Sequence, residues 1–483
     1  MRRVDSKGRD GSDCCNDYRV EVSLIQKLMK VIFRKERITV VLLMCCVVYG
    51  RPVMGEQKTP DTALYGVEQS VRDYSEKNLD GLTEELLRYN SQLQSLAAKI
   101  NAAHAFIPQA SALDDPRLSF EVSNIPVDNP SFHRTPMTGM QIYLRQRIPF
   151  PGKLGLKKKI AESREAQAVE EHLETLNQLV AKFKGSFYDY AFIFKAVDIS
   201  QKTIGRLQAL TKNLEAKYAV GEVPQQDVLK TKVELSKMRE RLIRQDKMKD
   251  ILASRITTLL HRPGKTPLKI VVSKTALTGL PGGLEELRKV AQNSRHWLNR
   301  ADKIINEAEY QHALSKKELL PDFDFSIGYR LRSNAIEGSV FGEDFFSAGV
   351  SVNIPVWTTR KQGKRVEQTR YLVTAARKDK ESTEQETIYQ VERLFFEVTR
   401  LKEQYELYRS RIVPESESAL VSSRRSYEAN EVDYLNVITN ELNLFQVQLL
   451  MHQYYFEHEK KIAELEMAIG KPLAALSFTG DAL

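Results

Sequence analysis

The chain has 483 residues, of which 42% are hydrophobic and 28% are charged, and its formal net charge is +9. This composition excludes a disordered chain, and the length exceeds that of one compact domain. Residues 1–55 hold 11 basic and 6 acidic residues, so the rest of the chain carries only about +4. We therefore exclude a large nucleic-acid-binding surface and expect no nucleic acid partner.

Residues 1–55 are predicted to be an N-terminal extension and signal peptide. Residues 38–49, ITVVLLMCCVVY, form an apolar run behind a basic cluster. This run is shorter than the ~20 residues that span a bilayer, and its charge asymmetry is typical of an export signal. We expect cleavage near Gly55, and Met29 is an alternative start because it opens an ordinary signal sequence.

The mature chain contains no thiol, because every cysteine falls in the predicted signal region: Cys14, Cys15, Cys45 and Cys46. The sequence therefore excludes a disulfide, a cysteine–zinc site and a cysteine nucleophile in the exported protein. Met44 is a poor fit to the small residue that precedes a lipidated cysteine. After residue 55, no run of 18 or more apolar residues predicts a transmembrane helix.

A first structural repeat is predicted over residues 56–263. It opens with an ascending helix at about 65–106, which is followed by weakly alternating strands at 118–122 and 139–149. Apolar residues between Val169 and Val197 then recur in steps of three and four, the seam of a coiled coil.

The helix that carries this seam is long. If residues 153–219 form a single helix, it measures roughly 100 Å at 1.5 Å per residue. An ordinary globular domain cannot contain such a helix.

The long helix ends in KYAVGEVPQQDVLK (217–230), and a matching interruption, SYEANEVDYLNVIT, occurs at 426–439. The two align without gaps at an offset of 209, which indicates an internal duplication. The aligned positions are Tyr218 with Tyr427, Gly221 with Asn430, Val223 with Val432, Pro224 with Asp433 and Asp227 with Asn436. Glycine and asparagine adopt the left-handed conformation that ends helices, so each interruption predicts a tight helical hairpin.

An equatorial linker is predicted at residues 264–290, a second repeat at 291–472 and a C-terminal tail at 473–483. The second repeat has its own ascending helix, over about 284–317. Residues 322–332 and 346–354 alternate apolar and polar side chains, which predicts two strands.

A second long helix is predicted over residues 360–428. Pro414 should kink it, because proline lacks the backbone donor and clashes with the preceding turn.

The predicted strands have one apolar and one polar face, which fits either a sheet packed on a core or an outer-membrane barrel. The export signal and the long flanking helices favour the barrel. Backbone groups in lipid must all be paired, and four strands are too few to close, since about eight are needed. Three chains of four strands would close a twelve-stranded barrel. The predicted fold class is thus an internally duplicated α+β membrane protein.

Nearly the whole mature chain resembles the TolC family of outer-membrane efflux proteins. The resemblance rests on the duplicated Tyr-x-x-Gly/Asn-x-Val hairpins, on Leu320-Pro-Asp before a strand, and on the repeated strand–Ile-Pro–helix junction. Residues 113–126 (LDDPRLSFEVSNIP) and 146–162 (QRIPFPGKLGLKKKIAE) resemble the subgroup associated with heavy-metal cation efflux.

The resemblance implies a homotrimer in the Gram-negative outer membrane, surrounded by its lipid and continued by a periplasmic α-helical barrel. It also implies two protein partners, a periplasmic adaptor (membrane fusion) protein and an inner-membrane pump. Together they would form an exit duct for metal cations or small toxic molecules.

By position, the resemblance makes Asp227 a constriction-lining acid and Tyr427 a hinge tyrosine. The chain departs from the family prototype where two ring acids correspond to Asn436 and Thr439 and a basic bracing residue corresponds to Glu431. Either Glu431 and Asp433 supply the negative field, or the gate is less cation-selective. The predicted tip and gate residues also include Tyr218, Gly221, Val223, Asn430 and Val432.

No pattern in the sequence predicts an enzyme, a cofactor or a metal site. The stretch Arg262-Pro-Gly-Lys-Thr266 has a leucine, Leu259, where a phosphate-binding loop needs its first glycine. Two alternative functions stay open: an outer-membrane channel for type I protein secretion, and an exported coiled-coil scaffold that conducts nothing.

Overall fold

The computed structural model describes residues 78–128, 130, 135, 137–263, 276–332, 343–429 and 431–476. All of them belong to one structural unit that begins at Tyr74. The predicted signal peptide, the four cysteines, Asn430, and much of the linker and the tail lie outside the described residues. Among the helices that are described, none combines the length and the apolar character needed to cross a bilayer.

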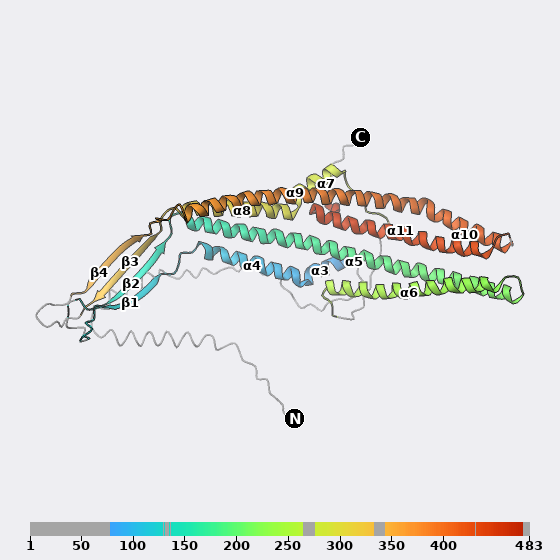
Figure 1. The fold of residues 1–483 in the computed structure, drawn as a ribbon, viewed down its shortest axis with the longest axis horizontal. Helices are drawn as coiled ribbons and strands as arrows, with labels where there is room; N and C mark the ends of the chain where they lie inside the picture. Colours follow the sequence, from blue (N-terminus) through green and yellow to red (C-terminus); the bar gives the residue numbers. More distant parts are fainter. Residues whose placement is uncertain are drawn as a thin grey trace, which may run out of the picture. The chain divides into compact units, whose positions relative to one another are not determined.

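The elements occur twice in the same order (Figure 1). The first set is α3 (Leu79–Tyr89), α4 (Ser91–Ser111), β1 (Arg117–Ser123), β2 (Gly139–Ile148), α5 (Lys153–Ala219) and α6 (Gln225–Leu259). The second set is α7 (Leu284–Ser294), α8 (His296–Lys317), β3 (Phe323–Leu331), β4 (Phe345–Val352), α9 (Gln362–Leu407), η2 (Tyr408–Ile412), α10 (Val413–Glu428) and α11 (Tyr434–Ile469). A 3₁₀ turn at Leu473–Ala475 follows.

The ascending helices were predicted as one helix in each half, at about 65–106 and 284–317, and this was wrong for the described part; residues 65–77 lie outside the described residues. Each is divided by a single non-helical residue, Asn90 in the first half and Arg295 in the second. The Asn90 side chain caps α4 by accepting hydrogen bonds from the amides of Gln92 and Leu93, as N-cap asparagines do. Helix α4 then continues to Ser111, beyond the predicted end at residue 106.

Helix α5 has the predicted bounds, residues 153–219. The predicted single apolar seam was too simple, because Phe187 is buried whereas Phe194 is 60% exposed. The reason is that α5 contacts helices on both of its flanks: α4 and α6 on one side, α8 and α11 on the other. It is therefore an interior helix of a layer and not one strand of a two-stranded coiled coil.

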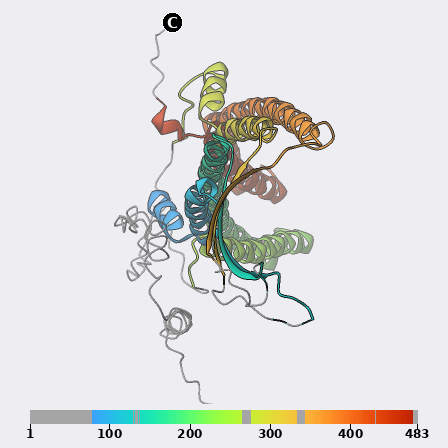
Figure 2. The same ribbon diagram turned by 90° about the vertical axis from the view of Figure 1, so that its left-hand side faces the viewer.

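The helices of this unit form a layer that is four helices wide. Next to the sheet, the order of contacts is α4, α5, α8 and α9, and toward the hairpins it is α6, α5, α11 and α9 with α10. Figure 2, which looks along the helices, shows α3 and α7 beside this layer; α3 packs on α5, and α7 packs on α9 and α11. Helices α4 and α6 form one edge, and α9 and α10 form the other.

The four strands form one antiparallel sheet in the order β1-β2-β3-β4, which leaves β1 and β4 as its edges. Directly opposed residues share a face of the sheet. The register therefore places Phe120, Ile142, Tyr329 and Phe346 in one apolar row across the sheet. The predicted strand alternation is confirmed, and the apolar face is open, with Phe120 68% and Phe346 63% exposed.

Asp322 joins the sheet to the helices. Its carboxylate accepts hydrogen bonds from Lys153 Nζ at 2.7 Å, the Phe150 amide at 2.9 Å and Arg147 Nη2 at 3.1 Å. Lys153 begins α5, and Arg147 lies near the end of β2. Partial burial alone would raise the pKa of Asp322, but these hydrogen bonds and positive charges outweigh it and hold that pKa below its usual value.

Pro414 was predicted to kink the second long helix, and the structure has a π-helical turn just before this proline. Residues Tyr408–Ile412 form this turn between α9 and α10, and Pro414 follows in the first turn of α10. A π turn changes the hydrogen-bond pattern ahead of proline, which has no N–H to donate. Helices α9 and α10 thus follow each other without a loop, but the α-helical hydrogen-bond pattern changes between them. Helix α5 has no such change.

Candidate functional site at the helical hairpins

The first hairpin turn, between α5 and α6, is closed by a left-handed glycine. Gly221 has φ +80°, its amide donates to the Tyr218 carbonyl at 3.0 Å, and the Glu222 amide donates to the Lys217 carbonyl at 2.9 Å. These two bonds form the Schellman motif that satisfies the last carbonyls of a helix. The conformation predicted for Gly221 is confirmed, and Pro224 lies at the N-cap of α6.

The second hairpin turn, between α10 and α11, repeats these hydrogen bonds at the offset of 209. The Glu431 amide donates to the Ser426 carbonyl at 2.8 Å, which matches the bond from Glu222 to Lys217. The Asn436 amide donates to the Asp433 carbonyl at 3.1 Å, as the Asp227 amide does to Pro224. Asp433 lies at the N-cap of α11, although its side chain accepts no hydrogen bond there.

The two hairpins pack together through a small apolar cluster. Leu214 and Val228 of the first hairpin are buried against Tyr434 and Ile438 of the second, and the half-buried Val223 and Tyr427 pack against them. The cluster brings together two of the predicted site residues, Val223 and Tyr427, and the Asp227 carboxylate lies near Tyr434 of the same cluster. Burial of such side chains supplies most of the free energy that holds helices together.

Two tyrosines of the second hairpin carry the polar contacts of this cluster. Lys217 Nζ of α5 lies over the ring of Tyr427, 4.7 Å from its centroid, a cation–π contact. Tyr434 is only 2% exposed. Burial, with the nearby Asp227 carboxylate as the second cause, raises the pKa of Tyr434 to about 12. Both hydroxyls are buried without a well-aligned hydrogen-bond partner within the described residues.

A buried carboxylate, Glu441 of α11, joins three helices next to this cluster. Its side chain is 2% exposed and forms ion pairs with Arg206 of α5 and with Arg424 of α10, the latter at 2.8 Å. Because removing one partner of a buried pair leaves an uncompensated charge, this contact should strongly resist separation of the hairpins. The sequence interpretation missed Glu441, Arg206, Arg424 and Tyr434.

A charge reversal across the repeat could have revealed Glu441. At the offset of 209, Arg424 and Glu441 correspond to Glu215 and Lys232, which form an ion pair at 2.7 Å in the first hairpin. The first pair is about half exposed, with side-chain exposures of 46% and 51%, so solvent screens it. Both positions of the pair change sign between the two halves and keep opposite charges, so the sequence alone could have indicated that the two residues are in contact.

The remaining predicted site residues lie at the solvent-facing turns. Tyr218 is 45% exposed, and Gly221, Glu431, Asp433 and Asn436 are also exposed, whereas Val432 is half-buried. They do not converge on one another within this chain. Their proposed role at a constriction therefore depends on neighbouring copies.

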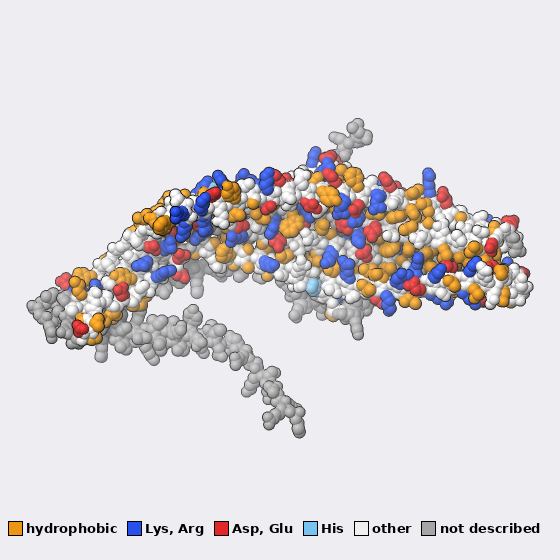
Figure 3. Space-filling view, in the orientation of Figure 1, with side chains coloured by type: hydrophobic (Ala, Val, Ile, Leu, Met, Phe, Trp, Pro, Cys, Tyr) orange, Lys and Arg blue, Asp and Glu red, His pale blue; other side chains and the backbone are white. Residues whose placement is uncertain are grey.

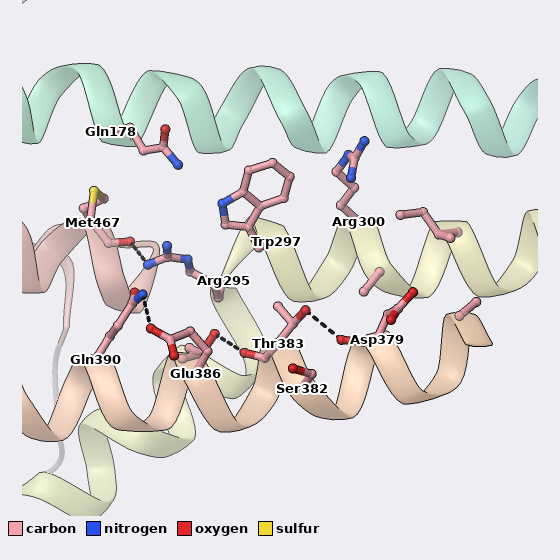
Figure 4. Close-up of a pocket in the computed structure, with 14 residues that line it drawn as sticks. Gln178, Arg295, Trp297, Arg300, Asp379, Ser382, Thr383, Glu386, Gln390 and Met467 are labelled. Carbon is pink, nitrogen blue, oxygen red and sulfur yellow. Dashed lines mark hydrogen bonds between the residues drawn. The ribbon is translucent and has the colours of Figure 1, made fainter. Parts of the chain in front are cut away.

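The described residues also contain a polar cavity of about 660 Å³, away from the hairpins (Figure 4). It lies where α8 begins and α11 ends, and Arg295, Trp297, Arg300 and Glu386 are among its lining residues. Arg295 donates to the Met467 carbonyl at 2.8 Å and forms a buried ion pair with Glu174 at 2.9 Å. Burial raises the pKa of Glu174, although Arg295 opposes this.

The described residues offer no cluster of side chains for a metal ion. No group of three or more histidine, cysteine, aspartate or glutamate side chains within them is placed to hold a metal ion. Figure 3 shows acidic and basic side chains interspersed over the helices on the face in view. The hairpin contacts described above hold the helices of the two hairpins together.

Comparisons with known proteins agree with this description. Residues 287–468 match the model of a family described as "Outer membrane efflux protein". This match covers most of the predicted second repeat, and the resemblance to outer-membrane efflux proteins predicted from the sequence is confirmed. No curated protein sequence matches the chain.

Several solved outer-membrane channels share the fold. A CusC structure has a TM-score of 0.70 at 16% identity and covers 82% of this chain and 93% of its own. VceC of Vibrio cholerae has a TM-score of 0.69 at 17% identity, covering 82% and 96%. The open-state MtrE channel of Neisseria gonorrhoeae has a TM-score of 0.65 at 13% identity, covering 82% and 89%. The predicted α+β fold of the chain, with four strands and long helices, is confirmed.

Proposed function

We propose that this chain is one protomer of a trimeric exit duct in the outer membrane, which passively conducts solute from a periplasmic adaptor and an inner-membrane pump to the exterior. The observation that carries the proposal is a layer four elements wide with two open edges. The edges run from the sheet, at β1 and β4, into the helices, at α4 and α6 on one side and α9 and α10 on the other.

The sheet supports closure between chains. Its apolar face is one to two thirds exposed at positions such as Phe120, Phe325 and Val350, which suits contact with lipid. In lipid, the unpaired backbone groups of β1 and β4 would each cost several kcal/mol, so the sheet must close on itself. Four strands cannot curl into a barrel, and copies related by rotation supply the missing strands.

The helices support the same closure through their duplication. Leu229 of α6 corresponds to Ile438 of α11 at the offset of 209, yet Leu229 is 53% exposed and Ile438 is 3% exposed. The reason is that α11 lies between α5 on one side and α9 and α10 on the other, whereas α6 has its main contact with α5 alone. A second copy that places α9 and α10 against α6 would reproduce the contact that α5 makes with α11.

Exposed apolar side chains mark both edges of the helix layer. On α6 they are Leu229, Val233, Ile243 and Ile251, and on α9 they are Tyr371, Tyr389, Phe396 and Leu407. At 100° per residue, each set lies opposite the buried face of its own helix. The two edges thus offer apolar surface for contact with the next copy.

The hairpins are the proposed docking tip and gate. Three copies would place Asp227 and the second-hairpin residues Glu431, Asp433 and Asn436 around one opening, where an adaptor binds from the periplasm. The chain offers no nucleotide-binding motif, so we expect the pump to supply the energy. The cargo that the sequence resemblance favours is a metal cation or a small toxic molecule.

The test combines reconstitution with a substitution at the helix edge. The processed protein should migrate as a heat-modifiable trimer and conduct ions in a planar lipid bilayer. Ile243→Asp should abolish the trimer and the conductance while the far-UV circular dichroism stays helical. Arg239→Asp, a control at another exposed position of α6, removes no apolar contact and should keep both.

Two results would favour the alternatives. A processed protein that stays out of the detergent-extracted outer membrane would contradict the channel and favour a scaffold. A conducting trimer whose loss blocks export of a protein, and not of small solutes, would favour type I secretion.

A further inference from the structure

The polar face of the sheet carries an excess of positive charge. Strand residues that share this face include four arginines, Arg117, Arg145, Arg147 and Arg330, and two carboxylates, Glu121 and Asp324. The proposed barrel would turn this face toward its interior, since the other face is apolar. The inference that follows rests on that proposed function.

Two of the arginines lie directly opposite each other. The register pairs Arg117 of β1 with Arg145 of β2, and both side chains are exposed. Opposed residues of an antiparallel pair have their Cβ atoms about 5 Å apart, and like charges at this spacing destabilise the sheet. A bound negative group would offset the repulsion between the two guanidinium groups.

No such group is present within the described residues, where neither Arg117 nor Arg145 forms an ion pair or a hydrogen bond through its side chain. The acids nearest in sequence, Asp114 and Asp115, precede β1 and pair with neither arginine. The other two arginines are engaged: Arg147 Nη2 donates to Asp322 at 3.1 Å, and Arg330 donates to Ser123 Oγ at 3.4 Å.

The neighbours of this pair are small. The row that contains Arg117 and Arg145 continues with Ser326 of β3 and Gly349 of β4. Such small residues leave room for the guanidinium groups of Arg117 and Arg145 to project from the sheet. The Arg330 side chain instead lies against the backbone of Gly139, since a Cβ added to this glycine would be 2.8 Å from Arg330 Nε. Projecting guanidinium groups bind oxyanions through paired N–H donors.

We propose that Arg117 and Arg145 form an anion-binding ring inside the barrel, so that this end of the duct selects anionic cargo over free cations. Three copies would contribute six guanidinium groups at one level. Rings of arginine or lysine are the arrangement that favours anions in pores. A metal that leaves through this ring would pass as an anionic complex or oxyanion and not as a bare cation.

The test is the reversal potential of the full-length trimer in a neutral planar bilayer, with 100 mM KCl on one side and 10 mM on the other. The Debye length is then about 10–30 Å, so fixed charges act across the pore. We expect the wild-type pore to prefer chloride. The double variant R117Q/R145Q should reduce the chloride-to-potassium permeability ratio about twofold or more.

The matched control is R117K/R145K, which keeps the charge and should keep the preference for chloride. Each variant is also measured with Glu441→Ala, which loosens the hairpins, so that a narrow tip does not dominate the current. A trimer that conducts with the same reversal potential before and after R117Q/R145Q would overturn the anion ring and leave the duct intact. A chain that forms neither a trimer nor a pore would overturn both.

Discussion

Helices α6 and α11 are equivalent in the duplication but differ in their surroundings. Three aligned pairs show the difference: Leu229 with Ile438, Lys232 with Glu441, and Ile243 with His452. The α6 member of each pair is exposed, whereas Ile438 and Glu441 are buried and His452 is half-buried. The two helices follow the same kind of turn, with the same backbone hydrogen bonds. The two halves therefore share the backbone conformation of the turn, whereas the burial of equivalent side chains depends on the position of the helix in the layer.

This difference indicates which contacts matter within one chain. The interior helix α11 is held by buried polar contacts to α5 and α10. The edge helix α6 has exposed apolar side chains, which the proposed trimer would cover with another copy. Substitutions at equivalent positions should thus have unequal effects on the isolated protomer.

The largest effect is expected for Glu441→Ala. Removing this carboxylate breaks its charge-assisted hydrogen bonds to Arg206 and Arg424, and each such bond contributes about 1.5–3 kcal/mol. The equivalent Lys232→Ala breaks a half-exposed pair and should change the free energy of unfolding by about 1 kcal/mol or less. Chemical denaturation of both variants measures the difference, and equal losses would contradict the comparison.

The next effect concerns acid stability and His452 of α11. Burial, with Lys195 second, lowers the pKa of His452 to about 4. Below pH 6.5 the unfolded chain binds a proton that the folded chain refuses, so stability should fall between pH 6.5 and 4, by up to about 3 kcal/mol.

His452→Gln should remove this acid-sensitive component. Thermal unfolding from pH 7 to pH 4 would give a flatter profile for this variant than for the wild type. The control is Ile243→Gln at the equivalent position of α6, which should leave the slope of the profile unchanged. A wild-type profile that is flat over this range would refute the assignment.

A smaller effect is expected at the duplicated tyrosines. Tyr427→Ala removes a half-buried ring and its cation–π contact with Lys217, and we expect a loss of about 1–3 kcal/mol. The equivalent Tyr218→Ala removes an exposed ring and should stay within about 0.5 kcal/mol. Hydrogen exchange at the hairpin amides should accelerate only in the first variant, and faster exchange in both would erase the distinction.

The smallest effect on stability, but a visible one on conductance, is expected for Asp227→Asn. The carboxylate is half-buried at the start of α6, and three copies would surround the proposed constriction. The variant should form trimers normally and lose sensitivity to block by divalent cations. Asn436→Asp at the equivalent position should have the opposite effect, and a pore indifferent to both would place these residues outside the constriction.

The sequence predicted the elements that follow from local patterns. The bounds of α5 are the predicted ones, each strand lies within a few residues of its predicted range, and Gly221 has the conformation its turn required. These features depend on periodicity and on turn chemistry, which neighbouring residues determine. The break at Asn90 was missed, although asparagine is a residue type that commonly caps a helix.

Contacts between distant segments could not be predicted in the same way. The break at Arg295 depends on a buried ion pair with Glu174, 121 positions earlier in the chain. Asp322 gathers donors from residues near the end of β2 and the start of α5, and Glu441 joins three helices. Such contacts depend on the arrangement of the layer, which a single sequence does not specify residue by residue.

The most direct test of the exit duct is the number of chains in the detergent-solubilised complex, measured by native mass spectrometry. A sheet of four strands with two open edges predicts three chains per particle, and Ile243→Asp should convert them to single chains. A wild-type particle that holds one chain and still sits stably in the membrane would contradict the account.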